Sequence, residues 1–281
     1  MRRVRAGTVQ GILIEGEMRY LSTMITINNV TKTYGNQPSP AVDKLCLEIG
    51  EGQIVGFLGP NGAGKSTTIK MIVGILKQDS GTITVEGLDN VKDPVAVKSL
   101  IGFVPDEPNL YEKMTAVKYL NFVADIYGVS EAQRKERIEK YAKLFEIDRN
   151  LPDELSSFSH GMKQKIAVIA AILHDPKIII LDEPMVGLDP RSSFILKELL
   201  SKLAKEGKTV FFSTHVMEVA ERLCDRIAII NKGKLVTQGT LEEIKAMKGE
   251  ENATLEKLFL ELTGSDDVLT EAAEEGREEE I

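Results

Sequence analysis

Long apolar runs are missing from this sequence. No stretch of 18 consecutive apolar residues occurs in its 281 residues, so no segment is expected to span a membrane. Before Met24 the single apolar cluster is Ile12-Leu13-Ile14, which is too short for the core of a signal peptide. Met18 and Met24 are alternative start positions. We therefore interpret residues 1–23 as an N-terminal extension outside the folded domain, either an upstream start or a mobile segment.

Cysteine and histidine are also scarce. The chain has two cysteines, Cys46 and Cys224, and three histidines. Two cysteines cannot build a disulfide framework, which fits a reducing cytoplasm. No spacing of these residues is typical of a zinc site. Both cysteines and His174 are interpreted as packing or surface residues, and the chain is expected to be cytoplasmic.

A broad basic face is absent as well. The net charge is -8, but residues 265–281 hold eight acidic side chains against the single Arg277 and so carry almost all of it. The rest of the chain is close to neutral, and nucleic acid is therefore not an expected partner. The tail at 265–281 is predicted to be solvated and disordered, with binding of a partner as the alternative interpretation.

The stretch Gly59-Pro60-Asn61-Gly62-Ala63-Gly64-Lys65-Ser66-Thr67 fits the P-loop pattern G-x-x-x-x-G-K-[ST]. Residues 53–58 before it form an apolar run of strand length, and residues 68–76 after it have helical spacing. Glycines let backbone N–H groups surround phosphate oxygens at the start of a helix. The alternative, a glycine-rich turn that binds nothing, is disfavoured by these flanks. The residues predicted to hold ATP are Gly59, Asn61, Gly62, Gly64, Lys65, Ser66 and Thr67, with Lys65 on the β- and γ-phosphates and Ser66 on Mg²⁺.

A second stretch, Ile178-Ile179-Ile180-Leu181-Asp182-Glu183, is apolar and then abruptly acidic. It predicts a buried strand that ends in two carboxylates, which is the Walker B arrangement. Asp182 would hold Mg²⁺, directly or through water. Glu183 would lie one residue further on, near the γ-phosphate, and polarise the attacking water.

The remaining periodicity predicts an α/β fold with an all-helical insert. Residues 24–34 and 42–49 alternate like strands of an antiparallel β subdomain. From residue 115 to 172 only helical patterns occur, and apolar strands alternate with helices after that. We predict a P-loop core with a mixed, mainly parallel sheet in a domain at 24–264, with the helical subdomain at about 106–172. The predicted helices are 95–100, 115–127, 131–145, 161–173, 192–205, 216–223, 240–247 and 254–262, and the further strands are 82–85, 101–104, 177–181, 209–213, 226–230 and 235–237.

Several other stretches carry a family resemblance. Phe158-Ser159-His160-Gly161-Met162-Lys163-Gln164 precedes the Walker B strand, Gly187-Leu188-Asp189-Pro190 follows it, and Ser213-Thr214-His215 ends a predicted strand. Pro105-Asp106-Glu107-Pro108 and the aromatic Tyr34 complete the set. With the P-loop and Walker B, these stretches resemble the ATP-binding subunit of an ABC transporter from Met24 to about Gly264.

The resemblance assigns roles to these residues. Ser159 and Gly161 of the signature would bind the γ-phosphate of ATP held by a second subunit, and Asp189 belongs to the D-loop. His215 would contact the γ-phosphate, Tyr34 would stack on adenine, and Asp106, in the Q-loop place, would ligate Mg²⁺. The resemblance thus implies that ATP is clamped between two chains and that hydrolysis releases the clamp.

Two residues depart from the family pattern. Asp106 stands where the Q-loop usually has Gln, and His160 stands where the signature usually has Gly. Aspartate brings a charge that the neutral amide lacks. Glycine at the second position lets the backbone approach the partner's phosphate closely, so the His160 ring is expected to crowd that approach. We therefore expect slower turnover but intact nucleotide binding.

The leading hypothesis is an Mg²⁺-dependent ATPase that powers a membrane transporter. Its partners would be a membrane-spanning permease and a second ATP-binding subunit, on the cytoplasmic face of the membrane. The stretches Met162-Lys163-Gln164 and 253–259 resemble the matching stretches in ATP-binding subunits of exporters. The alternatives are a non-transport member of the family, either an assembly scaffold or a translation-associated factor, and a regulatory ATP-binding module with little turnover.

Overall fold

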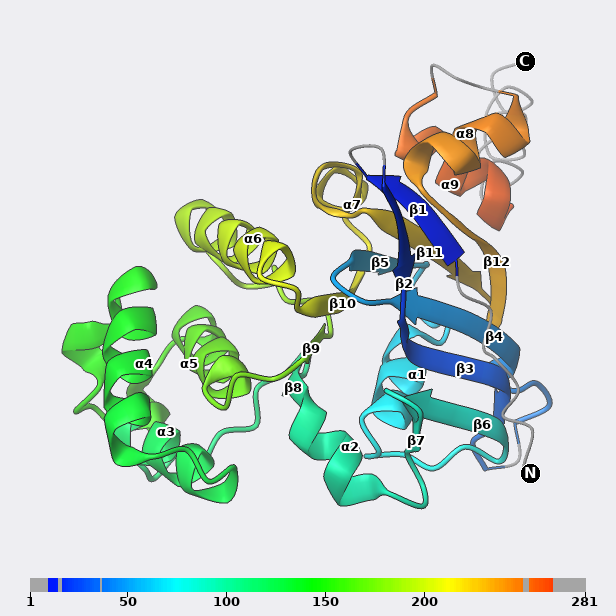
Figure 1. Ribbon diagram of the computed structural model, residues 1–281. Helices are drawn as coiled ribbons and strands as arrows, with labels where there is room; N and C mark the ends of the chain where they lie inside the picture. The colour runs from blue at the N-terminus through cyan, green and yellow to red at the C-terminus, as the bar shows by residue number, and fades with distance from the viewer. Residues whose placement is uncertain (1–9, 15–16, 36, 250–252, 265–281) are drawn as a thin grey trace, which may run out of the picture.

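The computed structural model describes residues 10–14, 17–35, 37–249 and 253–264 (Figure 1). The strands are β1 (Gln10–Ile14), β2 (Glu17–Leu21), β3 (Thr23–Lys32), β4 (Val42–Gly50), β5 (Ile54–Leu58), β6 (Ser80–Val85), β7 (Leu88–Asp89), β8 (Ile101–Val104), β9 (Ile178–Leu181), β10 (Thr209–Thr214), β11 (Arg226–Asn231) and β12 (Lys234–Gly239). The α-helices are α1 (Lys65–Ile72), α2 (Pro94–Leu100), α3 (Ala116–Ile126), α4 (Glu131–Leu144), α5 (His160–Ile172), α6 (Pro190–Lys205), α7 (Met217–Leu223), α8 (Leu241–Lys248) and α9 (Leu255–Thr263). Two short 3₁₀ turns, Asp148–Asn150 and Leu155–Ser157, precede α5.

A six-stranded sheet forms the centre of the molecule, in the order β12-β11-β5-β10-β9-β8. Its strands pair in parallel except for β12, which is antiparallel to β11. Every residue of β5, β9 and β10 is buried, because helices or a second sheet cover both faces. The mainly parallel sheet predicted from the unalternating apolar runs is confirmed.

A four-stranded antiparallel sheet, in the order β4-β3-β6-β7, packs beside the central one. The core between the two sheets includes Ile25 and Ile49 from the small sheet and Phe57 and Phe211 from the central one, with α1 between them. This arrangement holds the loop between β5 and α1 at the junction of the two sheets. The predicted antiparallel β subdomain is present.

Helices α3, α4 and α5 form the insert, and α5 and α6 cover the other face of the central sheet (Figure 1). Thr115, Ser130 and Ser159 cap the N-termini of α3, α4 and α5 with their side-chain oxygens, as such residues commonly do. Helices α7, α8 and α9 pack together against strands β5 and β11 of the central sheet. Within the described ranges, no helix combines the length and apolar character needed to cross a bilayer.

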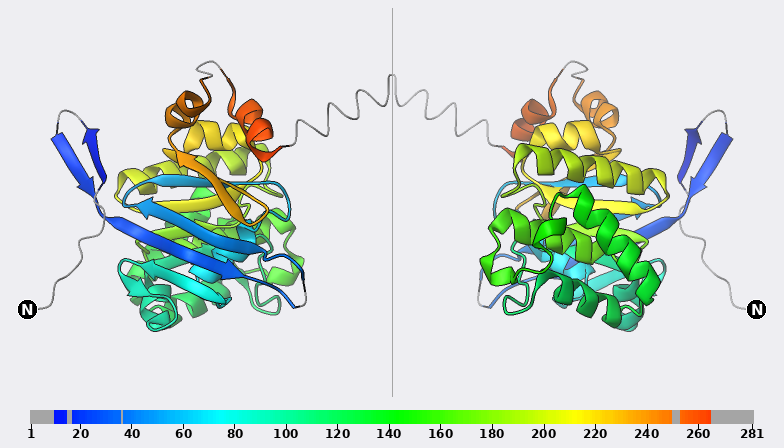
Figure 2. Two further views of the ribbon diagram at one scale, coloured as in Figure 1. Left: turned by 90° about the vertical axis from the view of Figure 1, so that its right-hand side faces the viewer. Right: turned by 90° about the vertical axis from the view of Figure 1, so that its left-hand side faces the viewer.

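Part of the N-terminal extension contains a strand pair that was not predicted from the sequence. Strands β1 and β2 form an antiparallel hairpin in which Gln10 pairs with Leu21 and Ile14 with Glu17. Figure 2 shows this hairpin projecting away from the rest of the molecule. Backbone pairing between these two neighbouring stretches forms the hairpin. The short apolar cluster Ile12-Leu13-Ile14 alone did not predict the second strand. The acidic tail predicted at 265–281 lies outside the described residues.

Candidate nucleotide-binding site

The P-loop connects β5 to α1 and lines a cavity of about 320 Å³. Residues 60–67, together with Ala41, Asp106 and Glu183, form its walls. Gly64 has φ +106, and a Cβ on it would lie 2.5 Å from the Ala41 carbonyl oxygen. Only glycine fits there, because of both this contact and the positive φ. The predicted strand, glycine loop and helix are all present.

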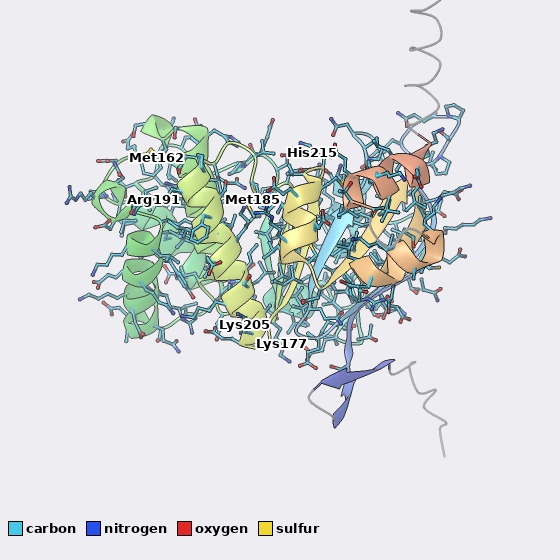
Figure 3. The ribbon with its side chains drawn as sticks, turned by 90° about the horizontal axis from the view of Figure 1, so that it is seen from above. Met162, Lys177, Met185, Arg191, Lys205 and His215 are labelled. Carbon is cyan, nitrogen blue, oxygen red and sulfur yellow. The ribbon has the colours of Figure 1, made fainter. Side chains whose placement is uncertain are left out.

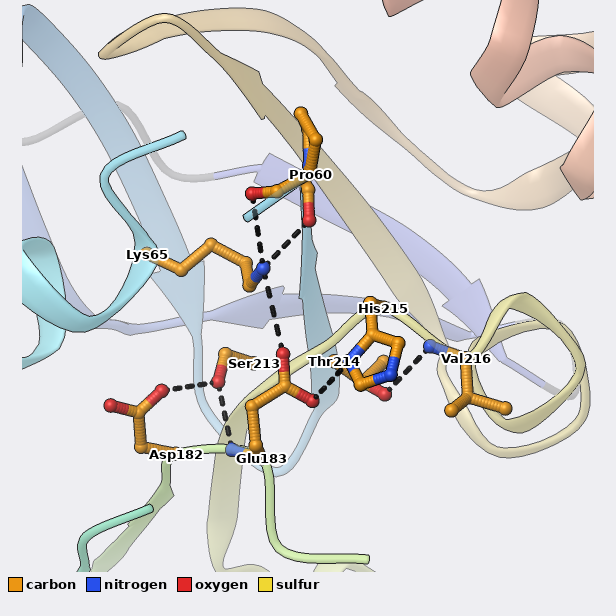
Figure 4. Close-up of polar contacts among 9 residues, drawn as sticks. Pro60, Lys65, Asp182, Glu183, Ser213, Thr214, His215 and Val216 are labelled. Atoms are coloured by element: carbon orange, nitrogen blue, oxygen red, sulfur yellow. Dashed lines mark hydrogen bonds and ion pairs between the residues drawn. The ribbon is translucent and has the colours of Figure 1, made fainter. Parts of the chain in front are cut away.

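Lys65 is buried at the base of this cavity. Its Nζ donates to the carbonyl oxygens of Gly59 at 2.6 Å and Pro60 at 3.3 Å. The same Nζ lies 3.5 Å from Oε1 of Glu183 (Figure 4). The ammonium group is therefore held by the carbonyls of the loop and by one carboxylate, in the region where phosphate oxygens bind in a P-loop.

Glu183 joins the P-loop to the end of β10. Its Oε2 lies 3.0 Å from Nδ1 of His215, while its Oε1 faces Lys65. The carboxylate is nearly buried and the His215 side chain is about half exposed. The three residues predicted to be catalytic, Lys65, Glu183 and His215, thus form one connected row (Figure 4).

Ser213 is a site residue that we did not single out from the sequence. Its hydroxyl donates to Oδ1 of Asp182 at 2.6 Å and accepts from the backbone N–H of Glu183 at 2.9 Å. Asp182 and Ser213 are both buried. The available signal was a hydroxyl two residues before His215, which we call the switch histidine, because strand ends that lie side by side in a parallel sheet bring such groups together.

The backbone of Glu183 has φ +48, a left-handed conformation that costs a non-glycine residue roughly 1–2 kcal/mol. The hydrogen bond from its N–H to Ser213 helps to hold it there. Strain of this kind is concentrated at functional sites, where the surrounding structure fixes the backbone. The conformation turns the Glu183 side chain toward the P-loop.

Asp106 lines the same cavity from the segment after β8. Burial and then the carboxylates of Asp182, Glu183 and Glu107 raise its pKa, and His160 opposes this shift. The Q-loop place therefore brings an additional carboxyl group toward the site. Tyr34 contacts the end of the P-loop, with its hydroxyl 3.4 Å from Oγ1 of Thr67.

The signature residues lie outside this cavity. Ser159 caps α5 by accepting from the Met162 N–H at 3.3 Å, and Gly161 lies in the first turn. Asp189 caps α6, and hydrogen bonds from the side chain and backbone of Ser192 lower its pKa to about 2. None of Ser159, Gly161 and Asp189 is among the residues that line the cavity. The structure brings together the P-loop, Walker B, Q-loop and switch residues, but not the signature and D-loop.

The P-loop, Glu183 and His215 follow β5, β9 and β10, and so they lie at the end of the central sheet where these parallel strands finish. In the view of Figure 3, Met162 and His215 are near one edge, Met185 lies between them and the centre, and Lys177 and Lys205 lie at the opposite edge. Ligands commonly bind beyond the carboxyl ends of parallel strands in α/β proteins.

Comparison with known proteins agrees with this geometry. Residues 42–186 match the family model described as ABC transporter. The chain belongs to the family of ABC transporter ATP-binding proteins. A curated relative, the ABC transporter ATP-binding protein NatA of Bacillus subtilis (strain 168), is 38% identical over 240 residues, which is 84% of this chain and 97% of that protein. The resemblance of the sequence motifs to this family is confirmed.

Solved structures give the same result. One, described as the ATP-binding subunit of an ABC transporter, matches with a TM-score of 0.82 and 34% identity over 86% of this chain and 100% of that chain. Another, a dimeric post-hydrolysis state of an ATP-binding cassette bound to ADP and Pi, matches with a TM-score of 0.72 and 30% identity over 78% of this chain and 99% of that one. The predicted α/β P-loop ATPase fold is confirmed, and the chain is an ATP-binding member of this ATPase family.

The residues present fit ATP and Mg²⁺. The P-loop backbone and the buried Lys65 line a cavity in which phosphate groups can be held, and Ser66 and Asp182 offer the oxygen ligands that Mg²⁺ prefers. Among the described residues, no three His, Cys, Asp or Glu side chains form a possible metal site by themselves. Mg²⁺ usually takes several of its oxygen ligands from the nucleotide and from water.

Proposed function

We propose that this protein binds ATP with Mg²⁺ and hydrolyses it to drive a membrane transporter. The observation that carries the proposal is the position of Glu183, whose two carboxylate oxygens face Lys65 and His215 at the mouth of the P-loop cavity. A carboxylate held there can orient and deprotonate a water molecule near the terminal phosphate. The buried lysine supplies positive charge to the phosphates.

The roles of the other residues follow from their places. Backbone N–H groups of residues 59–67 would bind the phosphates, and Ser66, Asp182 and Asp106 would hold the metal, which neutralises charge on the phosphates. His215 would bind the γ-phosphate while contacting Glu183, and Tyr34, beside Thr67, would stack on adenine. The Ser213 hydroxyl holds the Asp182 carboxylate and the Glu183 backbone in place through its two hydrogen bonds.

We propose that the complete site forms between two copies of this chain or between this chain and a similar one. Ser159, Gly161 and Asp189 lie outside the cavity that holds Lys65, although the first turn of a helix can bind an anion. A second subunit that presents its own signature would close over the nucleotide. The dimeric cassette with ADP and Pi supports this arrangement.

A groove on the helical insert suggests where a permease binds. Its volume is about 320 Å³, and the lining side chains come from the Q-loop segment, α3 and α5, including Pro108, Leu110, Tyr119 and His174. We propose that a cytoplasmic segment of a membrane-spanning permease docks here, which places the chain at the cytoplasmic face of the membrane. Export is the direction favoured by the exporter-like Met162-Lys163-Gln164 stretch.

Two measurements test this function. The full chain, expressed with a candidate membrane-spanning permease, should co-purify with that protein. The complex should also hydrolyse ATP in a Mg²⁺-dependent way. Turnover without any membrane partner would favour a non-transport role, and ATP binding without turnover would favour a regulatory module.

A further inference from the structure

The imidazole of His160 lies directly on the backbone of Gly187. Gly187 has φ +76, and a Cβ placed on it would be 2.2 Å from Cδ2 of His160 and 2.9 Å from Nε2. The ring thus occupies the space that a side chain at position 187 would need. His160 is the first residue of α5, and Gly187 lies in the loop between Glu183 and α6.

Three more contacts join the same two segments. A Cβ on Gly161 would lie 2.7 Å from the Gly187 carbonyl oxygen, so the two backbones touch. Nε2 of the buried Gln164 donates to the Pro184 carbonyl at 3.3 Å, and Nζ of Lys165 lies 3.7 Å from Oδ2 of Asp189.

These contacts come from one side of α5. Positions 160, 161, 164 and 165 are neighbours on a helix surface, since residues four apart lie above one another. They meet the loop 184–189 from its first residue to its last. We name this loop the D-loop segment. It begins directly after Glu183, whose backbone is in the left-handed conformation, and it ends at Asp189, the cap of α6.

We propose that His160 is a positioning residue that locks the D-loop segment onto the signature helix. The ring packs against the backbone of Gly187. Gln164 binds Pro184 at the start of the segment, and Lys165 pairs with Asp189 at its end. Because Glu183 directly precedes the segment and Asp189 ends it, the conformation of the segment fixes the positions of both. The proposal rests on the proposed ATPase function. It differs from the expectation drawn from the sequence, because one side of the exposed His160 ring contacts its own chain.

Glycine at position 160 would remove this cover, and a flat apolar ring would keep it. The test therefore compares the His160→Gly and His160→Phe variants of the full chain. Hydrogen exchange is measured at the amides of Val186 and Leu188, which donate to the carbonyls of Glu183 and Met185. We expect exchange at these amides to become about five- to tenfold faster in His160→Gly, since local opening costs less there, and to stay at the parent rate in His160→Phe.

The matched control is Lys163→Ala. Lys163 is in the same turn of α5 but pairs with Glu112, on the other side of the helix, so exchange in the D-loop segment should not change. A second readout is ATP turnover of the complete complex. We expect His160→Gly to lower kcat about threefold or more with KM unchanged, because the Lys65 cavity is intact and the change acts on positioning.

Unchanged exchange at Val186 and Leu188 in His160→Gly would overturn the proposal. So would a higher kcat in that variant, which would show that the ring obstructs the nucleotide. If the complex has no ATPase activity at all, the proposed function fails, whereas the exchange comparison still decides whether His160 holds the segment.

Discussion

Nδ1 of His215 lies 3.0 Å from Oε2 of Glu183, although 32 residues separate them in the chain. The parallel pairing of β9 with β10 produces this contact, because Leu181 lies beside Phe212 and the two strands end at the same edge. With Lys65 on the other oxygen of Glu183, one carboxylate connects the Walker B, switch and P-loop stretches. A change at any of the three stretches is therefore expected to affect the other two.

The Lys65→Ala variant should lose tight ATP binding. The side chain supplies the buried positive charge of the cavity, and hydrogen bonds to charged groups contribute about 1.5–3 kcal/mol. That corresponds to an affinity about 10- to 100-fold lower, measured by calorimetry on the full chain. Lys70→Ala, an exposed change on the same helix, is the control. Equal affinity in Lys65→Ala and the parent would remove Lys65 from the site.

The Glu183→Gln variant should bind ATP and fail to turn it over. The amide keeps the shape of the side chain but cannot take a proton from water, and a positioned general base accelerates a reaction by about 10²–10⁴-fold. Phosphate release from the complete complex gives the rate, and size exclusion with ATP should show a trapped dimer. Glu221→Gln, at an exposed position of α7, should behave as the parent. Hydrolysis by Glu183→Gln at the parent rate would exclude Glu183 as the base.

The Ser213→Ala variant should be less stable as well as less active. It leaves the Glu183 N–H and Oδ1 of Asp182 without their buried partner, and such losses cost about 1–3 kcal/mol. Chemical denaturation measures the change in the free energy of unfolding. Ser201→Ala, on α6, should cost much less. If Ser213→Ala unfolds at the parent denaturant concentration, the serine is not the link between the two carboxylate positions.

Most of the elements and the main motifs could be predicted from the sequence. Buried parallel strands such as Ile178–Leu181 are continuous apolar runs, and P-loop residues are contiguous, so each can be predicted locally. Contacts between distant segments could not be predicted in this way. The Ser213 hydrogen bonds depend on strand register, and the orientation of the His160 ring depends on a loop that follows another strand. The hairpin of β1 and β2 was missed because two short strands have little local signal.

Cross-linking should place the permease on the helical insert. Residues 109–114 follow the Q-loop place and border the groove that contains Leu110 and Tyr119. A cysteine introduced at Asn109 or Lys113 should cross-link to a cytoplasmic segment of the permease in the assembled transporter, detected by mass spectrometry. A cysteine at Lys248, at the end of α8, is the control. Cross-links from Lys248 alone would contradict docking at this groove.

His174 predicts a pH dependence of stability that is separate from catalysis. Its ring stacks on Tyr127 with centroids 3.7 Å apart and planes 12° apart, and burial lowers its pKa from 6.5 to about 4. The charged groups that act on the ring are Asp175, Arg137 and Lys208. Above pH 6.5 the ring is neutral in both the folded and the unfolded chain, so its burial has no protonation cost.

Between pH 6.5 and about 4 the unfolded chain binds a proton that the folded chain does not, so the free energy of unfolding falls as the pH falls. The His174→Phe variant keeps a ring on Tyr127 and removes this proton. We expect it to match the parent at pH 7 and to be more stable than the parent at pH 5, in urea unfolding at both pH values. His215→Gln, a change at a half-exposed histidine, should keep the parent's loss of stability. If the parent and His174→Phe lose equal stability between pH 7 and 5, the His174 ring is not held neutral in the folded protein.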